Sequence, residues 1–139
     1  MSDSLQTSLR IAASGLQAQS VRLRVISENI ANAQSTGSGP GDDPYVRKTV
    51  TFDSELDRTL GANLTKVKSV GLDSTPFKLE HDPGNPAADD KGMVKMPNVD
   101  LLVELADMRE ANRSYEANLQ VAKQSADMLN TTVGLMKDA

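Results

Sequence analysis

Apolar residues recur at alternating spacings of four and three along residues 4–34, as in a helix with one apolar stripe. Gln19 is the only polar residue of this stripe. Gly15 weakens the helix locally by about 1 kcal/mol relative to alanine. Because Ser4 is a suitable N-cap, we predict a helix from Ser4 to about Ala33. The stripe consists of Leu5, Leu9, Ala12, Leu16, Gln19, Leu23, Ile26 and Ile30.

The same spacing returns over residues 98–137, a stretch without proline. Pro97 and Asn98 indicate a stop followed by an N-cap, and Asp100 suits the positive end of a helix. A helix of this length would extend over about 55 Å. Its stripe consists of Leu101, Leu105, Met108, Asn112, Tyr115, Leu119, Ala122, Ala126, Leu129, Val133 and Met136.

The intervening residues 35–97 contain most of the nine glycines and all six prolines. Tyr45 to Phe52 alternates between apolar and polar side chains and is typical of a β-strand. Weaker strand candidates lie at 64–72 and 76–80, and loops rich in Gly, Pro and Asp lie at 36–44 and 81–92.

These patterns predict a mainly α fold with a small β insert. We expect the helices at 4–34 and 98–137 to pair as an antiparallel coiled coil and to form a helical core. Residues 35–97 would form the insert, with short strands or a β-hairpin and Gly/Pro loops.

A second apolar stripe beside each predicted seam bears on assembly. A self-contained helical hairpin would leave this stripe in water, whereas helices surrounded by other helices would bury it. Small residues at Ala12, Ala122 and Ala126 would permit close helix approach. Scattered surface Ala and Val also occur without special meaning, so a solitary hairpin stays open as an alternative. The second stripe consists of Ile11, Ala18 and Val25 on the first helix and Val103, Ala117 and Val121 on the second.

Composition narrows the classes of function. Aromatic residues make up 3% of the chain, which favours long helices with thin seams and a monomer of marginal stability. The net charge of −4 without a basic face argues against nucleic acid. No apolar run approaches the roughly 18 residues that would span a bilayer. The first residues, with Asp3 among them, do not resemble a cleaved secretory signal.

Candidate chemistry is sparse. There is no cysteine, so a disulfide or thiolate metal site is excluded, and one histidine, His81, cannot form a multi-histidine site. The carboxylates Asp82, Asp89 and Asp90 lack the spacing of a calcium-binding EF-hand loop. We therefore expect no enzyme activity, no cofactor and no bound metal.

Three segments, in order, resemble flagellar axial proteins, the family of rod, hook and hook-associated subunits. Residues 27–37 (SENIANAQSTG) resemble the Asn-x-Ala-Asn signature of that family, and residues 110–121 (EANRSYEANLQV) resemble its C-terminal helix. Residues 81–100 are similar, more narrowly, to a proximal rod subunit. The signature positions are Asn29, Ile30, Ala31 and Asn32.

This resemblance implies a structural subunit of the proximal rod, a part of the basal body that crosses the periplasm. Members are exported uncleaved through the flagellar type III apparatus, and their terminal helices form a D0-like helical core that assembles helically to transmit torque. Partners would be copies of the chain, other rod and basal-body proteins and the export apparatus. A different axial subunit, or a soluble helical adaptor, stays open. The predicted assembly seam is Leu5, Leu9, Leu16, Leu23, Ile26, Ile30, Leu101, Leu105, Met108, Tyr115, Leu119, Leu129 and Val133.

Overall fold

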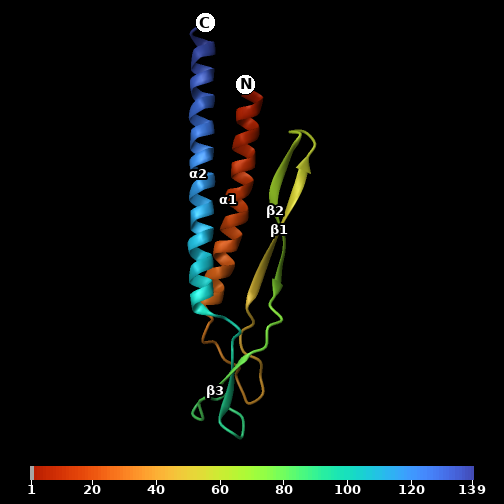
Figure 1. The fold of residues 1–139 in the computed structure, drawn as a ribbon, viewed down its shortest axis with the longest axis vertical. Helices are drawn as coiled ribbons and strands as arrows, with labels where there is room; N and C mark the ends of the chain where they lie inside the picture. Colours follow the sequence, from red (N-terminus) through yellow and green to blue (C-terminus); the bar gives the residue numbers. More distant parts are fainter. Residues whose placement is uncertain (1) are drawn as a thin grey trace. The chain divides into compact units, whose positions relative to one another are not determined.

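Two long helices and two small sheets make up residues 2–139, the part of the chain that the computed structural model describes (Figure 1). The strands pair as β1 with β2 and β3 with β4. The expected mainly α fold with a small β insert is confirmed. In chain order the elements are α1 (Ser2–Ala31), β1 (Lys48–Asp57), β2 (Ala62–Leu72), β3 (Lys78–His81), β4 (Met93–Met96) and α2 (Leu101–Lys137).

The helix starts differ from the predicted caps. Ser4 lies inside α1, which already begins at Ser2. The N-cap of α2 is Asp100, whose Oδ1 accepts a hydrogen bond from the backbone N–H of Leu102 at 3.0 Å. Asn98 was therefore the wrong cap, because its side chain is buried and bonds to other segments of the chain.

The chain forms two compact units, and each takes a segment from both helices. Among the described residues, the first unit comprises 2–23, Thr51–Ser69 and Arg109–Ala139. The second unit comprises Arg24–Val50 and Val70–Met108.

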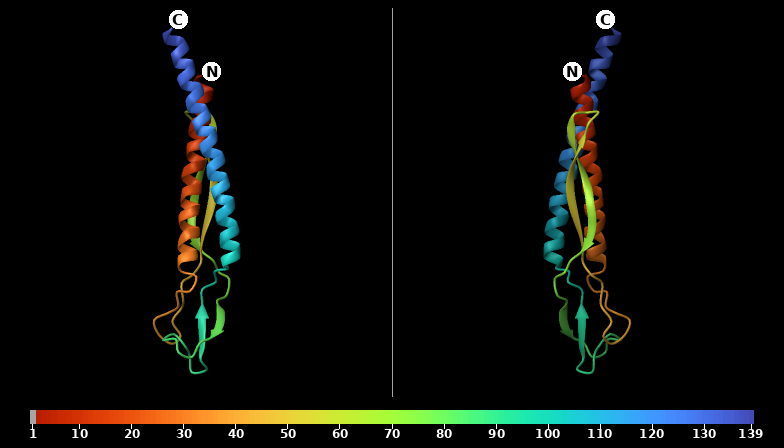
Figure 2. Two further views of the ribbon diagram at one scale, coloured as in Figure 1. Left: turned by 90° about the vertical axis from the view of Figure 1, so that its left-hand side faces the viewer. Right: turned by 90° about the vertical axis from the view of Figure 1, so that its right-hand side faces the viewer.

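In the first unit, α1 contacts α2 on one side and the β1–β2 hairpin on the other (Figures 1 and 2). The two helices run antiparallel and approach closely at Gly15, where an added Cβ would lie 2.6 Å from Nδ2 of Asn118. On the other side, the backbone N–H of Thr65 donates to Oγ of Ser14 at 3.2 Å. A side chain added at position 15 would thus have to displace the carboxamide of Asn118.

The second unit contains β3 and β4, which pair antiparallel with Lys78 opposite Met96 and His81 opposite Met93. Val94 on β4 is fully buried. The apolar pattern of the sequence does not predict β4 as a strand. Its four residues are too few to show alternation, and a buried valine between half-buried neighbours follows no clear period.

The second apolar stripe of α1 is mostly covered within the chain. Ala18 and Val25 are 2% and 3% exposed, whereas Ile11 is 40% exposed. Ala18 lines a small cavity together with Thr65 and Val67 of β2, so the hairpin covers the face that we assigned to neighbouring subunits. On α1, this stripe therefore does not need other chains, contrary to the prediction, because the hairpin covers part of it.

Candidate assembly interface and the polar network beneath it

The α2 face that the chain itself buries is set by small and polar residues. Glu104, Ala111 and Ser125 are buried, at spacings of seven and fourteen residues. Half-buried side chains lie on the same face between and after them: Met108, Tyr115, Asn118, Ala122 and Leu129. This face shares Met108, Tyr115, Ala122 and Leu129 with the predicted stripe but is otherwise turned from it by one residue.

The residues of the predicted seam fall into two groups. On α1, Ile26 is buried, and Leu5, Leu9, Leu16, Leu23 and Ile30 are half-buried. On α2, Met108, Tyr115, Leu119 and Leu129 are half-buried, whereas Leu101, Leu105 and Val133 are exposed. Those three leave apolar surface that the described chain does not cover.

Exposed apolar side chains flank the buried face of α2 on both sides in the first unit. Val121, Met128 and Leu135 recur every seven residues on one flank, and all three are exposed. On the other flank, the exposed Val133 follows the half-buried Leu119 by two heptads. A helix that needs only one partner shows a single apolar stripe, so α2 has the surface of a helix with more than one neighbour.

A groove accompanies the first flank. It encloses about 710 Å³ between Ser4 and Leu5 at the start of α1 and the α2 residues from Gln120 to Thr132, Met128 among them. Beyond this groove the last turns of α2 continue past the start of α1 (Figures 1 and 2). Leu135 and Met136 in these turns are 68% and 74% exposed.

The second unit shows apolar surface at the first turn of α2. Leu101, Leu102, Val103 and Leu105 are all exposed there, and so is Leu79 on β3. Leu79 and Leu101 line one cavity of about 360 Å³ together with Met96 and Val99. Large apolar side chains are therefore outside, while the polar residue Glu104 of the same turn is inside.

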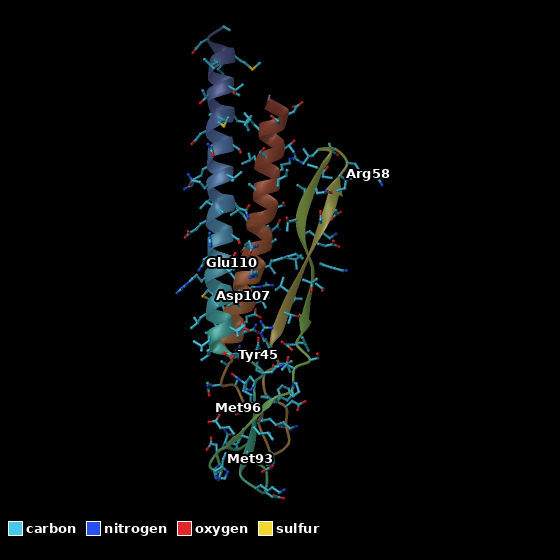
Figure 3. The ribbon with its side chains drawn as sticks, in the orientation of Figure 1. Tyr45, Arg58, Met93, Met96, Asp107 and Glu110 are labelled. Carbon is cyan, nitrogen blue, oxygen red and sulfur yellow. The ribbon has the colours of Figure 1, made fainter. Side chains whose placement is uncertain are left out.

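Beneath this surface, Asn29 is the centre of a buried polar network. Its Nδ2 donates to the backbone oxygen of Lys48 at 2.9 Å, and its Oδ1 accepts from the backbone N–H of Lys48 at 2.9 Å. The hydroxyl of Tyr45 donates to the same Oδ1 at 2.8 Å. Figure 3 shows Tyr45 beside the C-terminal end of α1 and the start of α2. Asn29 thus joins the end of α1 to the residues that enter β1.

Arg47 links three segments of the second unit. Its Nε donates to Oε1 of Glu104, and one terminal nitrogen lies 3.1 Å from Oδ2 of Asp73. Its backbone N–H donates to Oδ1 of Asn98 at 2.8 Å. Nδ2 of Asn98 in turn donates to the backbone oxygens of Asp73 and Thr75. Within residues 2–139, every buried side-chain nitrogen or oxygen has a hydrogen-bond partner.

The network shifts the pKa values of its members. Burial lowers the pKa of Arg47, but the hydrogen bonds and charges of Glu104 and Asp73 outweigh it and raise that pKa above its usual value. Hydrogen bonds from the hydroxyl and backbone of Thr75, followed by Arg47, lower the pKa of Asp73. Burial raises the pKa of Tyr45. Arg47 and Asp73 are therefore held in their charged forms.

The other signature residues lie at the end of α1. Ile30 is half-buried and Ala31 is exposed. Asn32 closes the helix, because its Nδ2 donates to the backbone oxygen of Glu28 at 2.9 Å. The sequence marked Asn29 through the family signature alone and gave no role to Arg47, Asp73 or Glu104. The available signal was a glutamate, Glu104, set among the leucines of the predicted helix.

His81 and Asp89 lie apart from the polar network. His81 is exposed at the end of β3, and Asp89 caps its own loop by accepting from the backbone N–H groups of Lys91 and Met93. Among residues 2–139, no group of three or more His, Asp or Glu side chains could hold a metal ion. None of the described helices is long and apolar enough to span a membrane.

Comparisons with known proteins place both ends of the chain in flagellar rod families. Residues 9–37 match the family described as "Flagella basal body rod protein", and residues 90–135 match "Flagellar basal body rod FlgEFG protein C-terminal". The chain is 62% identical to the flagellar basal-body rod protein FlgC of Agrobacterium fabrum, over 97% of both chains. It is 43% identical to FlgC of Salmonella typhimurium, over 90% of this chain and 92% of the other. It is also 36% identical to FlgC of Borreliella burgdorferi, over 96% and 98%.

The fold and these matches define a structural subunit of the bacterial flagellar rod and not an enzyme. Within that class, the chain belongs to the family of flagellar basal-body rod protein FlgC. The resemblance of residues 81–100 to a flagellar rod subunit is thereby confirmed.

Proposed function

We propose that the chain assembles helically with copies of itself and with other rod and basal-body proteins, through both terminal helices. The observation that carries the proposal is the exposed apolar surface on two flanks of α2, above all Val121, Met128 and Leu135 on the first. Burying such side chains stabilises an assembly by about 1.5–3 kcal/mol for each one that is fully covered.

The two flanks differ, so contacts between copies join unlike surfaces. Contacts of this kind do not close on themselves as a two-fold dimer does, and they generate rings or open helices. Within each chain, we propose that α1 and α2 pair as an antiparallel coiled coil around the Gly15–Asn118 contact and form the D0-like core.

Transmission of torque follows from such packing. Many small close-packed contacts resist shear, and small residues such as Ala12 and Ala111 let helix backbones approach closely. The assembly would act as the proximal driveshaft across the periplasm. Export uncleaved through the flagellar type III apparatus suits the chain, because its thin core can be opened at low cost.

The test replaces apolar flank residues without touching the buried face. Val121→Asn combined with Met128→Gln should leave the circular dichroism and thermal unfolding of the purified chain nearly unchanged. The same variant should reduce the amount of the chain in purified basal bodies and abolish swimming in soft agar, because two apolar contacts are lost.

The matched control is Glu116→Gln, an exposed polar position on the far side of the same helix. It should assemble and swim as the unmodified chain does. Normal basal bodies and swimming in the Val121→Asn, Met128→Gln variant would contradict assembly through this flank.

A further inference from the structure

A carboxylate occupies the α2 face that packs within the chain. Glu104 is fully buried, whereas Leu101, Leu102 and Leu105 around it are exposed. A helix that only had to pair with α1 would turn leucine inward and glutamate outward. Because an unpaired buried carboxylate is strongly unfavourable, Glu104 must be compensated before this end of α2 can pack.

The compensating charge comes from outside the two helices. Arg47, in the segment that leads into β1, donates to Oε1 of Glu104. From α1, Nδ2 of the uncharged Asn29 side chain lies 3.5 Å from Oε2 of Glu104, at the outer limit of a hydrogen bond. Pairing of the helices alone would therefore leave Glu104 without its cation.

Arg47 is in turn placed by the rest of the insert. Asp73 pairs with its guanidinium, and the backbone N–H of Asp73 donates to the backbone oxygen of Arg47 at 2.8 Å. Asn98 holds the backbone N–H of Arg47 and the backbone oxygens of Asp73 and Thr75. Three segments far apart in the sequence must meet before Arg47 faces Glu104.

We infer that Glu104 is a positioning residue that makes closure of the helix ends conditional on the folded insert. Residues 24–31 of α1 and 101–108 of α2 pack stably only when Arg47, Asp73 and Asn98 are in place. The inference rests on the proposed function in one respect, because its use is to keep the terminal helices of an exported chain apart until the insert has folded.

The experiment measures coupling in the full purified chain by hydrogen exchange. Asn98→Ala loosens the insert and is made with either Glu104 or Glu104→Leu. With Glu104, the amides of residues 26–31 and 105–108 should lose at least about 10-fold in protection, because Glu104 loses its placed partner. In the Glu104→Leu background, Asn98→Ala should lower the hydrogen-exchange protection of these amides by less than about 3-fold. Equal losses in both backgrounds would overturn the inference, because a purely structural role gives additive effects.

A control and a second variant complete the design. Asn85→Ala removes a hydrogen bond to Ala87 in the 81–92 loop, outside the network, and should change helix protection in neither background. If Asn98→Ala prevents folding, Arg47→Met takes its place. Adding Glu104→Leu to Arg47→Met should then restore protection, and failure to restore it would refute the inference. The coupling between positions 98 and 104 is measured in the isolated chain, without an assembled rod. Its result is therefore independent of whether the Val121→Asn, Met128→Gln variant assembles.

Discussion

The Asn29 side chain, on helix α1, pairs with the backbone of Lys48 as a neighbouring strand would. Its carboxamide donates to the backbone oxygen and accepts from the backbone N–H of Lys48. Asn29→Ala would leave those groups and the Tyr45 hydroxyl without a partner. We expect the free energy of unfolding to fall by about 2–4 kcal/mol, measured by urea denaturation. Asn32→Ala in the same signature removes a half-exposed helix-end bond and should cost less than about 1 kcal/mol. Equal losses for the two variants would contradict the role of Asn29.

Because of Asp73, we expect the free energy of unfolding to depend on pH in the acid range. Its pKa is lowered in the folded chain by Thr75 and Arg47, so the folded state binds the proton less readily than the unfolded state. The stabilisation is complete above the unfolded pKa of about 3.9 and is lost as the pH falls through the lower folded value. Urea midpoints between pH 6 and pH 3 should therefore fall more steeply for the unmodified chain than for Asp73→Asn. Parallel curves would show that Asp73 contributes nothing.

At the scale of the elements, the helix pair of the first unit depends on the absence of a side chain at residue 15. Gly15→Val should lower the melting temperature, because its side chain would overlap Asn118. The pair Gly15→Ala with Asn118→Ala should instead gain up to about 1 kcal/mol, since alanine favours helix and the obstructing side chain is gone. The measurement is thermal unfolding followed by circular dichroism. A stable Gly15→Val chain would mean that the helices approach less closely.

The long elements were predictable from the sequence for a simple reason. Spacings of four and three repeated over thirty residues leave one interpretation, so α1 and α2 followed from periodicity, and alternation from Tyr45 to Phe52 led to β1. The α2 face inside the chain was not predictable from hydrophobicity, because Glu104 and Ser125 lie inward while Leu101 and Leu105 lie outward. That choice depends on Arg47, 57 residues away, and no local pattern records it.

For the chain as a whole, the buried apolar residues within 2–139 are mostly alanine, with a few valines and one isoleucine. Such a core buries little area per residue, so we expect the isolated chain to be marginally stable. We expect weak hydrogen-exchange protection of residues 132–137 in dilute solution and strong protection of the same residues in purified basal bodies. Strong protection in the dilute chain would contradict a surface that is completed by assembly.

The β1–β2 turn has a practical consequence for labelling. Asp57 holds the backbone N–H groups of Thr59 and Leu60, Gly61 takes a left-handed conformation, and Arg58 extends from the exposed tip (Figure 3). An epitope or fluorophore inserted there would leave the apolar flanks of α2 bare, whereas a bulky group after residue 137 would crowd Leu135 and Met136. The β1–β2 turn is therefore the best site for a label that leaves the flagellar rod functional.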